Sequence, residues 1–257
     1  MLRPRIIPCL LIHQGGLVKT VRFGEPKYVG DPLNAVRIFN EKAVDELMVL
    51  DMDASRKRQP PNEALIAQLA AECRMPLCYG GGVKTVEQIE RLIALGVEKV
   101  AIGSAAIEDP DLITRAAERV GHQSLVGVID VKASGLLRRP EVVIRNASER
   151  TGRAPAEFAR TLQTLGVGEV VLNAVDRDGT MQGYDLELIK DVKQALGIPL
   201  TVLGGAGSLE DIRQLVQHYP VIGAAAGSLF VFKGKYRAVL INYPSATERL
   251  ALGCAPN

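Results

Sequence analysis

The sequence predicts an α/β fold, a (β/α)8 or TIM barrel forming one domain over residues 1–257, and three observations favour it. The length of 257 residues is typical of one such barrel, which needs about 250. Short apolar runs alternate with amphipathic stretches of helical period, which indicates a wholly parallel sheet covered by helices. The two halves of the chain also resemble each other, which an open sheet gives no reason to expect.

The repeat is clearest in two glycine-rich segments. Gly80–Val83 in the first half corresponds to Gly204–Gly207 in the second, and Ile102–Ala105 corresponds to Ala226–Leu229. Both pairs are separated by 124 positions. Two half-barrels of four strand–helix units each would produce this constant spacing, so the sequence predicts a barrel built from two half-barrel repeats.

The elements are expected in the following order. A strand at Arg5–Leu11 precedes about twenty residues of loop, and then Asp31 and Pro32 predict the start of a helix that runs to about Lys42. Further strands are expected at Glu46–Asp51, Pro76–Tyr79, Lys99–Ile102, Leu125–Asp130, Glu169–Asn173, Pro199–Leu203 and Val221–Ala224. Helices are expected at Asn62–Cys73, Val86–Leu95, Pro110–Val120, Pro155–Leu165, Leu186–Leu196, Leu209–His218 and near Lys235–Ile241, with an extra hairpin at Gly135–Ile144.

Composition excludes several classes of partner. Lys and Arg number 31 against 29 Asp and Glu, so no overall charge draws the chain to nucleic acid or to an anionic membrane. No stretch resembles a signal peptide or a membrane span, and the four cysteines show no paired spacing. We therefore expect a cytoplasmic protein with reduced cysteines, no cofactor and no metal.

Two sets of glycines predict phosphate sites. The active site of such a barrel lies at the carboxyl ends of its strands, where glycine backbone N–H groups can converge on an anion. The first cradle comprises Gly81, Gly82, Gly103 and Ser104, and the second cradle comprises Gly205, Ala206, Gly207, Gly227 and Ser228. Two cradles across one mouth predict a small-molecule ligand phosphorylated at both ends, although single glycine loops often only turn the chain. Lys19 in the long loop would add a cation to the binding site.

Carboxylates end three of the expected strands, at Asp51, Asp130 and Asp176. A charged residue at the end of an apolar strand is costly unless it is paired or chemically active. Acid–base chemistry on a carbon skeleton usually needs one group to remove a proton and another to deliver one. The repeat places Leu11 opposite Asp130, and leucine can do neither.

The amino-terminal end of the barrel, its floor, carries a second group of charges. Because alternate residues of a barrel strand point inward, Arg5, Lys99 and Glu169 share a face with the inward strand ends. Glu46 lies at a comparable height on the second strand. Charged residues at strand starts are often merely solvated, so spacing alone leaves their role open.

These motifs resemble the cyclase subunit of imidazole glycerol phosphate synthase, the ammonia-accepting half of a glutamine amidotransferase in histidine biosynthesis. The match runs from Arg5 to about Phe230 and includes the segments Arg5–Leu10, Gly80–Val83, Asp176–Thr180 followed by Gly183–Asp185, and Gly204–Gly207. The resemblance implies a heterodimer in which a glutaminase docks at the barrel floor. Ammonia would pass a gate, which would here be Arg5, Glu46, Lys99 and Glu169, and travel up the barrel interior.

The same resemblance implies that two aspartates act as acid and base on a bisphosphorylated ribonucleotide imine. One matches Asp130, but the other falls on Leu11, and His13 and Gln14 also replace charged residues usual in this loop. Removing one of two acid–base groups costs roughly 10²–10⁴-fold in rate. We therefore expect a paralogue in which ammonia delivery is kept and the original cyclisation is lost.

The chain is similar to cyclase-like proteins associated with amidation of bacterial surface sugars, as in lipopolysaccharide O-antigen biosynthesis. There a glutaminase-like partner and the barrel supply ammonia to a separate sugar amidotransferase, and Val239–Pro244 resembles that branch. Two alternatives stay open. One is a true cyclase with a rearranged acid, and the other is a non-catalytic barrel that activates the glutaminase by docking.

Overall fold

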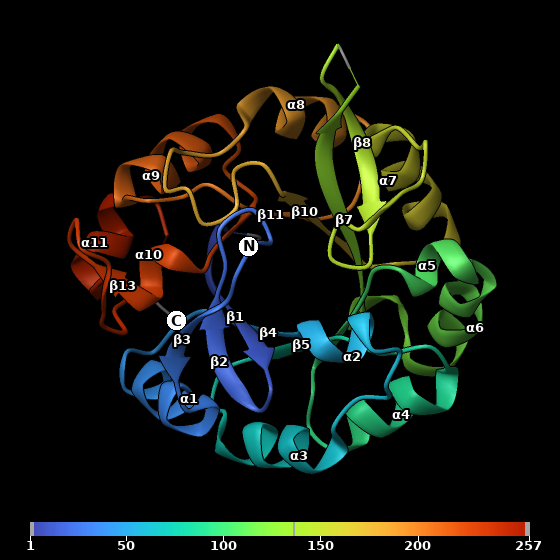
Figure 1. Cartoon of the computed structure of the whole chain (residues 1–257), viewed down its shortest axis with the longest axis horizontal. Helices are drawn as coiled ribbons and strands as arrows, with labels where there is room; N and C mark the ends of the chain where they lie inside the picture. Colours follow the sequence, from blue (N-terminus) through green and yellow to red (C-terminus); the bar gives the residue numbers. More distant parts are fainter. Residues whose placement is uncertain (1–2, 136, 255–257) are drawn as a thin grey trace.

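Parallel strands close into a barrel in the computed structural model, which describes residues 3–135 and 137–254 (Figure 1). Strand β1 pairs with both β4 and β12, and β7 pairs with β10 to complete the ring, so no barrel strand is left with a free edge. The TIM barrel expected from the sequence is confirmed. Its strands, in spatial order, are β1 (Arg5–His13), β4 (Leu47–Asp51), β5 (Leu77–Gly80), β6 (Lys99–Ile102), β7 (Leu125–Ser134), β10 (Glu169–Ala174), β11 (Leu200–Leu203) and β12 (Gly223–Ala226).

Helices surround the strands on the outside (Figure 1). The long ones each begin and end within two residues of the expected bounds. Side chains just before the first turn cap five of these described helices, and α7 instead begins with Pro155 at its first position. Asp31, for example, accepts a hydrogen bond from the Asn34 N–H and precedes Pro32. These helices are α1 (Pro32–Glu41), α3 (Glu63–Glu72), α4 (Val86–Ala94), α6 (Asp111–Val120), α7 (Pro155–Leu165), α8 (Leu186–Gln194) and α9 (Leu209–His218).

Short helices follow some strands before the long ones begin, and the sequence did not predict them. They are α2 (Met52–Arg56), α5 (Ala105–Glu108) and α10 (Ser228–Val231), and a single 3₁₀ turn, η1, spans His122–Ser124. Helices α5 and α10 occupy corresponding places after the two Gly-Ser pairs. This correspondence agrees with the predicted half-barrel repeat.

Side chains alternate between two apolar layers. Along β1, Ile6, Leu10 and Ile12 pack against the helices, whereas Ile7 and Cys9 point into the barrel. The inward set forms what we call the interior cluster, which comprises Ile7, Cys9, Met48, Cys78, Ala101, Val126, Val171, Leu203 and Ala225. All four cysteines are free, as expected.

The long loop expected after the first strand is instead a β-ribbon, so that expectation was wrong. Strand β1 continues to His13, and the chain then returns as β2 (Gly16–Lys19) and β3 (Lys27–Gly30), both antiparallel. Gln14 and Gly15 form a two-residue turn with φ of 50° and 77°, the left-handed pair that a tight hairpin of this type requires. Glutamine is an uncommon residue there, which is why the sequence did not reveal the turn.

The helix expected near Lys235–Ile241 was also wrong. Strands β13 (Phe232–Lys233) and β14 (Ala238–Val239) form a hairpin there, and helix α11 (Ala246–Ala251) comes later. The turn between β13 and β14 is closed by a hydrogen bond from the Arg237 N–H to the Gly234 carbonyl.

The extra hairpin predicted after the fifth barrel strand does form. Strand β7 is longer than expected and pairs with β8 (Arg139–Ile144), which is followed by β9 (Glu149–Arg150). Figure 1 shows this hairpin rising beyond the ring of helices. Leu136, part of the predicted segment, lies outside the described residues.

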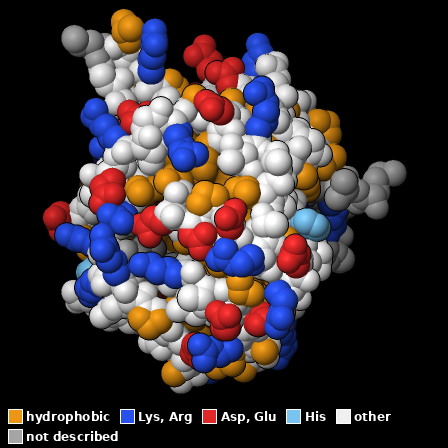
Figure 2. Space-filling view, turned by 90° about the vertical axis from the view of Figure 1, so that its right-hand side faces the viewer, with side chains coloured by type: hydrophobic (Ala, Val, Ile, Leu, Met, Phe, Trp, Pro, Cys, Tyr) orange, Lys and Arg blue, Asp and Glu red, His pale blue; other side chains and the backbone are white. Residues whose placement is uncertain are grey.

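Acidic and basic side chains both occur across the face shown in Figure 2. This mixture fits the nearly balanced composition. Within the part of the chain that the structure describes, no helix is both long and apolar enough to cross a bilayer. The single-domain organisation over residues 1–257 stays a prediction.

Replacing Asp31, the N-cap of α1, tests whether the capping residue predicted from the sequence stabilises the protein. Asp31→Ala removes the acceptor for the Asn34 N–H and should lower the free energy of unfolding by about 1 kcal/mol. Chemical denaturation followed by circular dichroism measures this loss. Asp31→Asn keeps an acceptor at the same place and should lose much less, and equal losses would contradict the capping role.

Candidate functional site

A pocket opens at the carboxyl ends of the barrel strands, and we call it the mouth pocket. Its open volume is about 880 Å³. The structure brings together there many of the residues singled out in the sequence, which are Leu11, Lys19, Asp51, Gly81, Gly103, Ser104, Asp130 and Gly227. Asn173 and Asp178 also line it, although neither was expected as a site residue.

Asp130 is the acid at the centre of this pocket. It lies on β7, and its Oδ1 accepts a hydrogen bond of 2.9 Å from the Asn173 Nδ2. Burial raises the pKa of Asp130 to about 6, although the bond from Asn173 opposes the rise and the charge of Asp178 adds to it. A carboxyl group with such a pKa can take up and release a proton near neutral pH.

Leu11 lines the same pocket but offers no polar atom. Because β1 runs on to His13, the histidine two positions further could in principle face the pocket as well. Its Nδ1 instead lies 2.9 Å from the Asp53 Oδ1, and Asp53 also accepts from the Gln14 N–H. His13 therefore does not stand in for the missing acid in this arrangement.

Lys19 and Asp178 form a buried ion pair on another side of the pocket. The Lys19 Nζ lies 2.9 and 2.7 Å from the two Asp178 carboxylate oxygens. The lysine stem packs over Gly227, where an added Cβ would come within 2.8 Å of the Lys19 Cε. Ribbon β2 thus holds its cation beside the second cradle, and glycine at position 227 makes room for it.

The two other expected carboxylates have local structural partners. Asp51 caps α2 by accepting from the N–H groups of Asp53 and Ala54, and burial nevertheless raises its pKa. Asp176 does not line the mouth pocket, and its Oδ2 accepts a 2.7 Å hydrogen bond from the Ala133 N–H. In the segment Asp176–Thr180, Asp178 is therefore the aspartate that lines the mouth pocket.

The first cradle is a hollow beside the mouth pocket. Gly81, Gly82, Gly103 and Ser104 line it together with the cationic residues Arg58, Lys84 and Arg145. The φ angles of 124° at Gly81 and 73° at Gly82 favour glycine, and a Cβ at Gly82 would lie 2.3 Å from the Gln59 carbonyl oxygen. A glycine turn with cations around it suits a phosphate group, although Glu108 also lines the hollow and pairs with Arg145.

Arg145 comes from the turn after β8, and no pattern in the sequence marked it as a site residue. Its N–H donates to the Ser104 Oγ at 3.2 Å, and its guanidinium pairs with Glu108 and Glu149. The extra hairpin therefore reaches over the first cradle. Only the fold reveals this, because the hairpin and the cradle are about forty residues apart in sequence.

The second cradle is more tightly closed. Gly205, Ala206, Gly207 and Ser228 do not line the mouth pocket. The Gly207 N–H donates to the Asp211 carboxylate at 2.9 Å, and a Cβ at Gly205 would meet the Gly183 carbonyl oxygen at 2.1 Å. The Ser228 Oγ is buried without a hydrogen-bond partner among the described residues. A hydroxyl left in this way is costly unless a ligand or water satisfies it.

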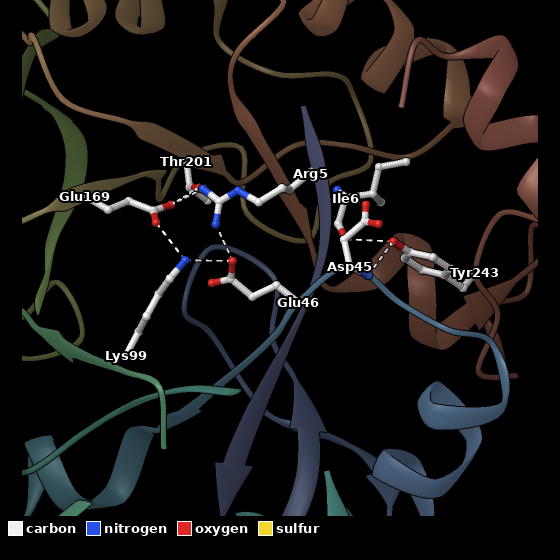
Figure 3. Close-up of polar contacts among 8 residues, drawn as sticks. All are labelled: Arg5, Ile6, Asp45, Glu46, Lys99, Glu169, Thr201 and Tyr243. Atoms are coloured by element: carbon white, nitrogen blue, oxygen red, sulfur yellow. Dashed lines mark hydrogen bonds and ion pairs between the residues drawn. The ribbon is translucent and has the colours of Figure 1, made fainter. Parts of the chain in front are cut away.

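The floor of the barrel carries a closed ring of four charges, which we call the ionic ring (Figure 3). Arg5 pairs with Glu46 and, at 2.7 Å, with Glu169. Lys99 pairs with the same two carboxylates, at 2.8 Å to Glu46 and 3.0 Å to Glu169. Glu46 lies just before β4, two residues before Met48, whose side chain belongs to the interior cluster. All four residues expected at the floor thus meet inside the barrel.

Opposite charges outweigh burial in setting the pKa values of Lys99 and Glu169 in the ionic ring. Burial lowers the pKa of Lys99, but Glu169 and Glu46 outweigh that effect and leave its pKa raised. Burial likewise raises the pKa of Glu169, yet Arg5 and Lys99 leave its pKa lowered. The Thr201 hydroxyl, which the sequence reasoning missed, donates to the Glu169 Oε1 at 2.5 Å. Their neighbours therefore favour the charged forms of Lys99 and Glu169.

The interior cluster lies between the ionic ring and the mouth pocket. Cys9, Ala101 and Leu203 belong to this cluster and also line the mouth pocket, so the two regions are continuous. Among residues 3–135 and 137–254, no group of three or more His, Cys, Asp or Glu side chains is placed to hold a metal ion.

Fold and site together define a class of protein, a TIM barrel with a pocket lined by Asp130 and Lys19 at its mouth and an ionic ring at its floor. Comparison with known proteins gives the family. The model of the family described as histidine biosynthesis protein matches residues 5–237. The chain belongs to this family and, within it, to the HisF-type subunits.

Several relatives support this assignment over nearly the whole chain. A "Putative imidazole glycerol phosphate synthase subunit HisF" of Leptospira borgpetersenii is 55% identical over 252 residues, 98% of this chain and 99% of the relative. The similarly named hisF3 protein of Vibrio vulnificus is 57% identical over 249 residues, 97% of this chain and 96% of the relative. An "Imidazole glycerol phosphate synthase subunit HisF" of Alkaliphilus metalliredigens is 40% identical over 230 residues, 90% and 91% of the two chains.

The raised pKa of Asp130 predicts a pH-dependent effect on stability. A carboxyl group whose pKa is about 6 when folded and about 4 when unfolded stabilises the fold below pH 4 and loses that contribution as the pH rises through 6. Asp130→Asn cannot ionise. At pH 7.5 its free energy of unfolding should therefore be about 1–2 kcal/mol higher than that of the unmodified chain.

Urea denaturation at a series of pH values measures this difference. The difference should shrink toward zero below about pH 3, where Asp130 is protonated in both states. Asp31→Asn, at an exposed cap, serves as the matched control and should show no such pH-dependent gain. A constant difference between Asp130→Asn and the unmodified chain across the series would contradict the raised pKa.

Proposed function

We propose that this chain is the ammonia-accepting subunit of a glutamine amidotransferase and that it has lost the usual cyclisation reaction. A glutaminase partner would dock at the barrel floor to form a cytoplasmic heterodimer. Ammonia would enter at the ionic ring, cross the interior cluster and emerge in the mouth pocket. The acceptor would be a sugar of a surface polysaccharide, amidated by a separate sugar amidotransferase.

One contrast carries this proposal: the floor holds a full set of four paired charges, whereas the mouth holds Asp130 facing a pocket wall formed partly by Leu11. Acid–base chemistry with two groups is compromised when one of them is a hydrocarbon. Entry of a small neutral molecule at the floor needs nothing from position 11. In strand β1, Arg5 at the start therefore supports ammonia entry, whereas Leu11 near the end counts against cyclisation.

The interior cluster supports passage of ammonia. TIM-barrel interiors are usually filled by bulky branched side chains, but Cys9, Cys78, Ala101 and Ala225 are small. Small apolar side chains suit a neutral molecule of this size and exclude its charged, hydrated form.

The choice of acceptor rests on similarity. The tail motif Val239–Pro244 resembles the surface-sugar branch. Two relatives that match nearly the whole chain, at 57% and 52% identity, carry the names hisF3 and hisF2, which supports a paralogue but names no acceptor. The two alternatives named above make different predictions. A true cyclase would turn over the ribonucleotide, and a pure docking barrel would not need an open interior.

Restoring an acid at position 11 tests the lost reaction. The unmodified chain, given ammonium salt and the bisphosphorylated ribonucleotide imine, should show little formation of imidazole glycerol phosphate. Leu11→Asp should raise the rate, by up to about 10²-fold, because a second carboxylate then lines the pocket with Asp130.

Leu11→Asn is the matched control, since it adds polarity of similar size without an ionisable group, and it should leave the rate low. Product formation is followed by chromatography. Near-normal cyclisation by the unmodified chain would overturn the paralogue proposal and favour the true cyclase.

Narrowing the interior tests the passage of ammonia. Ala101→Leu places three further carbon atoms among the interior cluster, close to Gly80. With the glutaminase partner and glutamine as nitrogen source, nitrogen delivery to the acceptor should fall several-fold while glutamine hydrolysis continues. The excess ammonia, measured with glutamate dehydrogenase, should appear in solution.

Ala116→Leu, equally buried but on the outer side of the barrel in α6, is the matched control for the cost of overpacking. It should leave the coupling between hydrolysis and delivery intact. If Ala101→Leu also leaves coupling intact, the interior is no conduit and the docking-barrel alternative is favoured.

A further inference from the structure

At the floor of the barrel, β1 and β4 are not joined by the backbone pairing that joins them higher up. Their paired residues run from Cys9–Met48 to Ile12–Asp51. The N–H groups of odd-numbered residues in β1 point toward β12, the neighbour on the other side. The bond from the Arg5 N–H to the Ile222 carbonyl, just before β12, shows this direction. Pro8 has no N–H to offer toward β4, so the pairing stops above it.

Two side chains replace the missing backbone bonds. The Ile6 N–H donates to the Asp45 Oδ2 at 2.9 Å. The Tyr243 hydroxyl accepts from the Asp45 N–H at 3.2 Å and donates to the Ile6 carbonyl at 2.9 Å (Figure 3). Because one hydroxyl serves as both acceptor and donor, it links the two strands where they do not bond to each other.

Arg249 completes this link from helix α11. Its Nη1 lies 3.3 Å from the Asp45 Oδ1 and donates to the Ala43 carbonyl at 3.0 Å. Its guanidinium stands 5.6 Å from the centre of the Tyr243 ring. Arg249 is only 4% exposed and Asp45 only 6%, so this contact is not a solvated surface pair.

Both linking residues belong to the tail, which we define as residues 238–254. The family match ends at residue 237, just before the tail begins. Main-chain bonds from Leu240 to Val231 and from Asn242 to Phe230 fix the path of the tail, and the Tyr243 ring packs 5.5 Å from that of Phe230. The tail therefore returns to the barrel floor along a defined route.

We propose that Tyr243 and Arg249 are positioning residues for the ionic ring. Ile6 and Asp45 sit on the outer side of their segments, and the next residues, Arg5 and Glu46, point inward. Holding the outer pair together therefore sets how Arg5 and Glu46 meet inside. The geometric claim is independent of function, whereas its consequence for ammonia entry rests on the proposed function.

The ionic ring is sensitive to such positioning because its contacts are short and shared. The Glu46 Oε2 serves both Arg5 and Lys99. A small shift of the Asp45–Glu46 segment away from β1 would lengthen both contacts at once, and hydrogen bonds weaken steeply outside their normal range of distances. Lys99 would then lose one of its two carboxylate partners.

Tyr243→Phe tests the geometric claim, because it removes the hydroxyl and keeps the ring that packs on Phe230 and Arg249. The readout is the NMR signal of the Lys99 side chain, assigned by comparison with Lys99→Arg and titrated with pH. We expect the Lys99 resonance to move and its pKa to fall toward the ordinary lysine value, because Glu46 no longer raises it as strongly.

Tyr236→Phe is the matched control. Tyr236 lies just before the tail and is 84% exposed, away from the ionic ring. Arg249→Lys, which keeps the positive charge near Asp45, provides a second variant if Tyr243→Phe fails to fold, and the same movement is expected. A Lys99 titration identical to that of the control in every folded variant would overturn the proposal.

The functional arm uses the complex with the glutaminase partner. Tyr243→Phe should increase the ammonia released into solution per glutamine hydrolysed several-fold, because a displaced Glu46 loosens the entrance. A changed Lys99 signal without increased release would leave the positioning claim standing and count against the proposed entry of ammonia. An unchanged Lys99 signal would count against the positioning claim, whatever the release.

Discussion

Closure of the barrel between β7 and β10 is the constraint on which the rest of the structure depends. Once the sheet is closed, every barrel strand has one face inside and one face outside, and side chains must alternate between them. Strand β1 shows the result, because Ile6, Leu10 and Ile12 pack outward while Ile7 and Cys9 pack inward. The inward line starts at Arg5 in the ionic ring and ends at Leu11 in the mouth pocket. Floor and mouth are therefore two ends of one interior.

Burial of four charges at the floor needs a physical account. Each isolated charge would be costly there, and pairing offsets that cost only when geometry is good and the remaining polar atoms are satisfied. The ionic ring meets these conditions through alternating signs, through the Thr201 hydroxyl on Glu169 and through the tail, which holds Glu46 beside Arg5 from outside. Even so, buried ion pairs add little net stability compared with apolar packing. Pairing therefore explains how four charges are tolerated at the floor, and the proposed entry of ammonia would give a reason for their presence.

The sequence predicted those parts of the fold and site in which local signals and barrel geometry agree. Helix starts such as Asp31-Pro32 were predictable because capping is local, and Arg5, Lys99 and Glu169 were predictable from period-two alternation. Prediction failed where the chain leaves regular structure. The turn at Gln14-Gly15 lacks the usual residues, and beyond Ala174 the chain turns helically, so alternation no longer decides whether Asp176 or Asp178 faces the pocket. Contacts made across the mouth, such as that of Arg145 with Ser104, depend on tertiary structure alone.

The ionic ring and the interior cluster differ in how strongly they support a function in ammonia passage. Removing one member of the ionic ring would leave the remaining three charges with an uncompensated net charge, which is costly in a buried site, so stability alone would tend to keep the ring once it exists. No such pressure keeps the side chains at Cys9, Cys78, Ala101 and Ala225 in the interior cluster small. Larger side chains at Ala101 and Ala225 would fill the barrel as they do in other barrels, and removal of apolar surface from water favours them. Leu11 shows that the inward line of β1 accepts a bulky apolar residue at the mouth. The small side chains between floor and mouth are therefore the part of the structure that argues most directly for a path through the barrel.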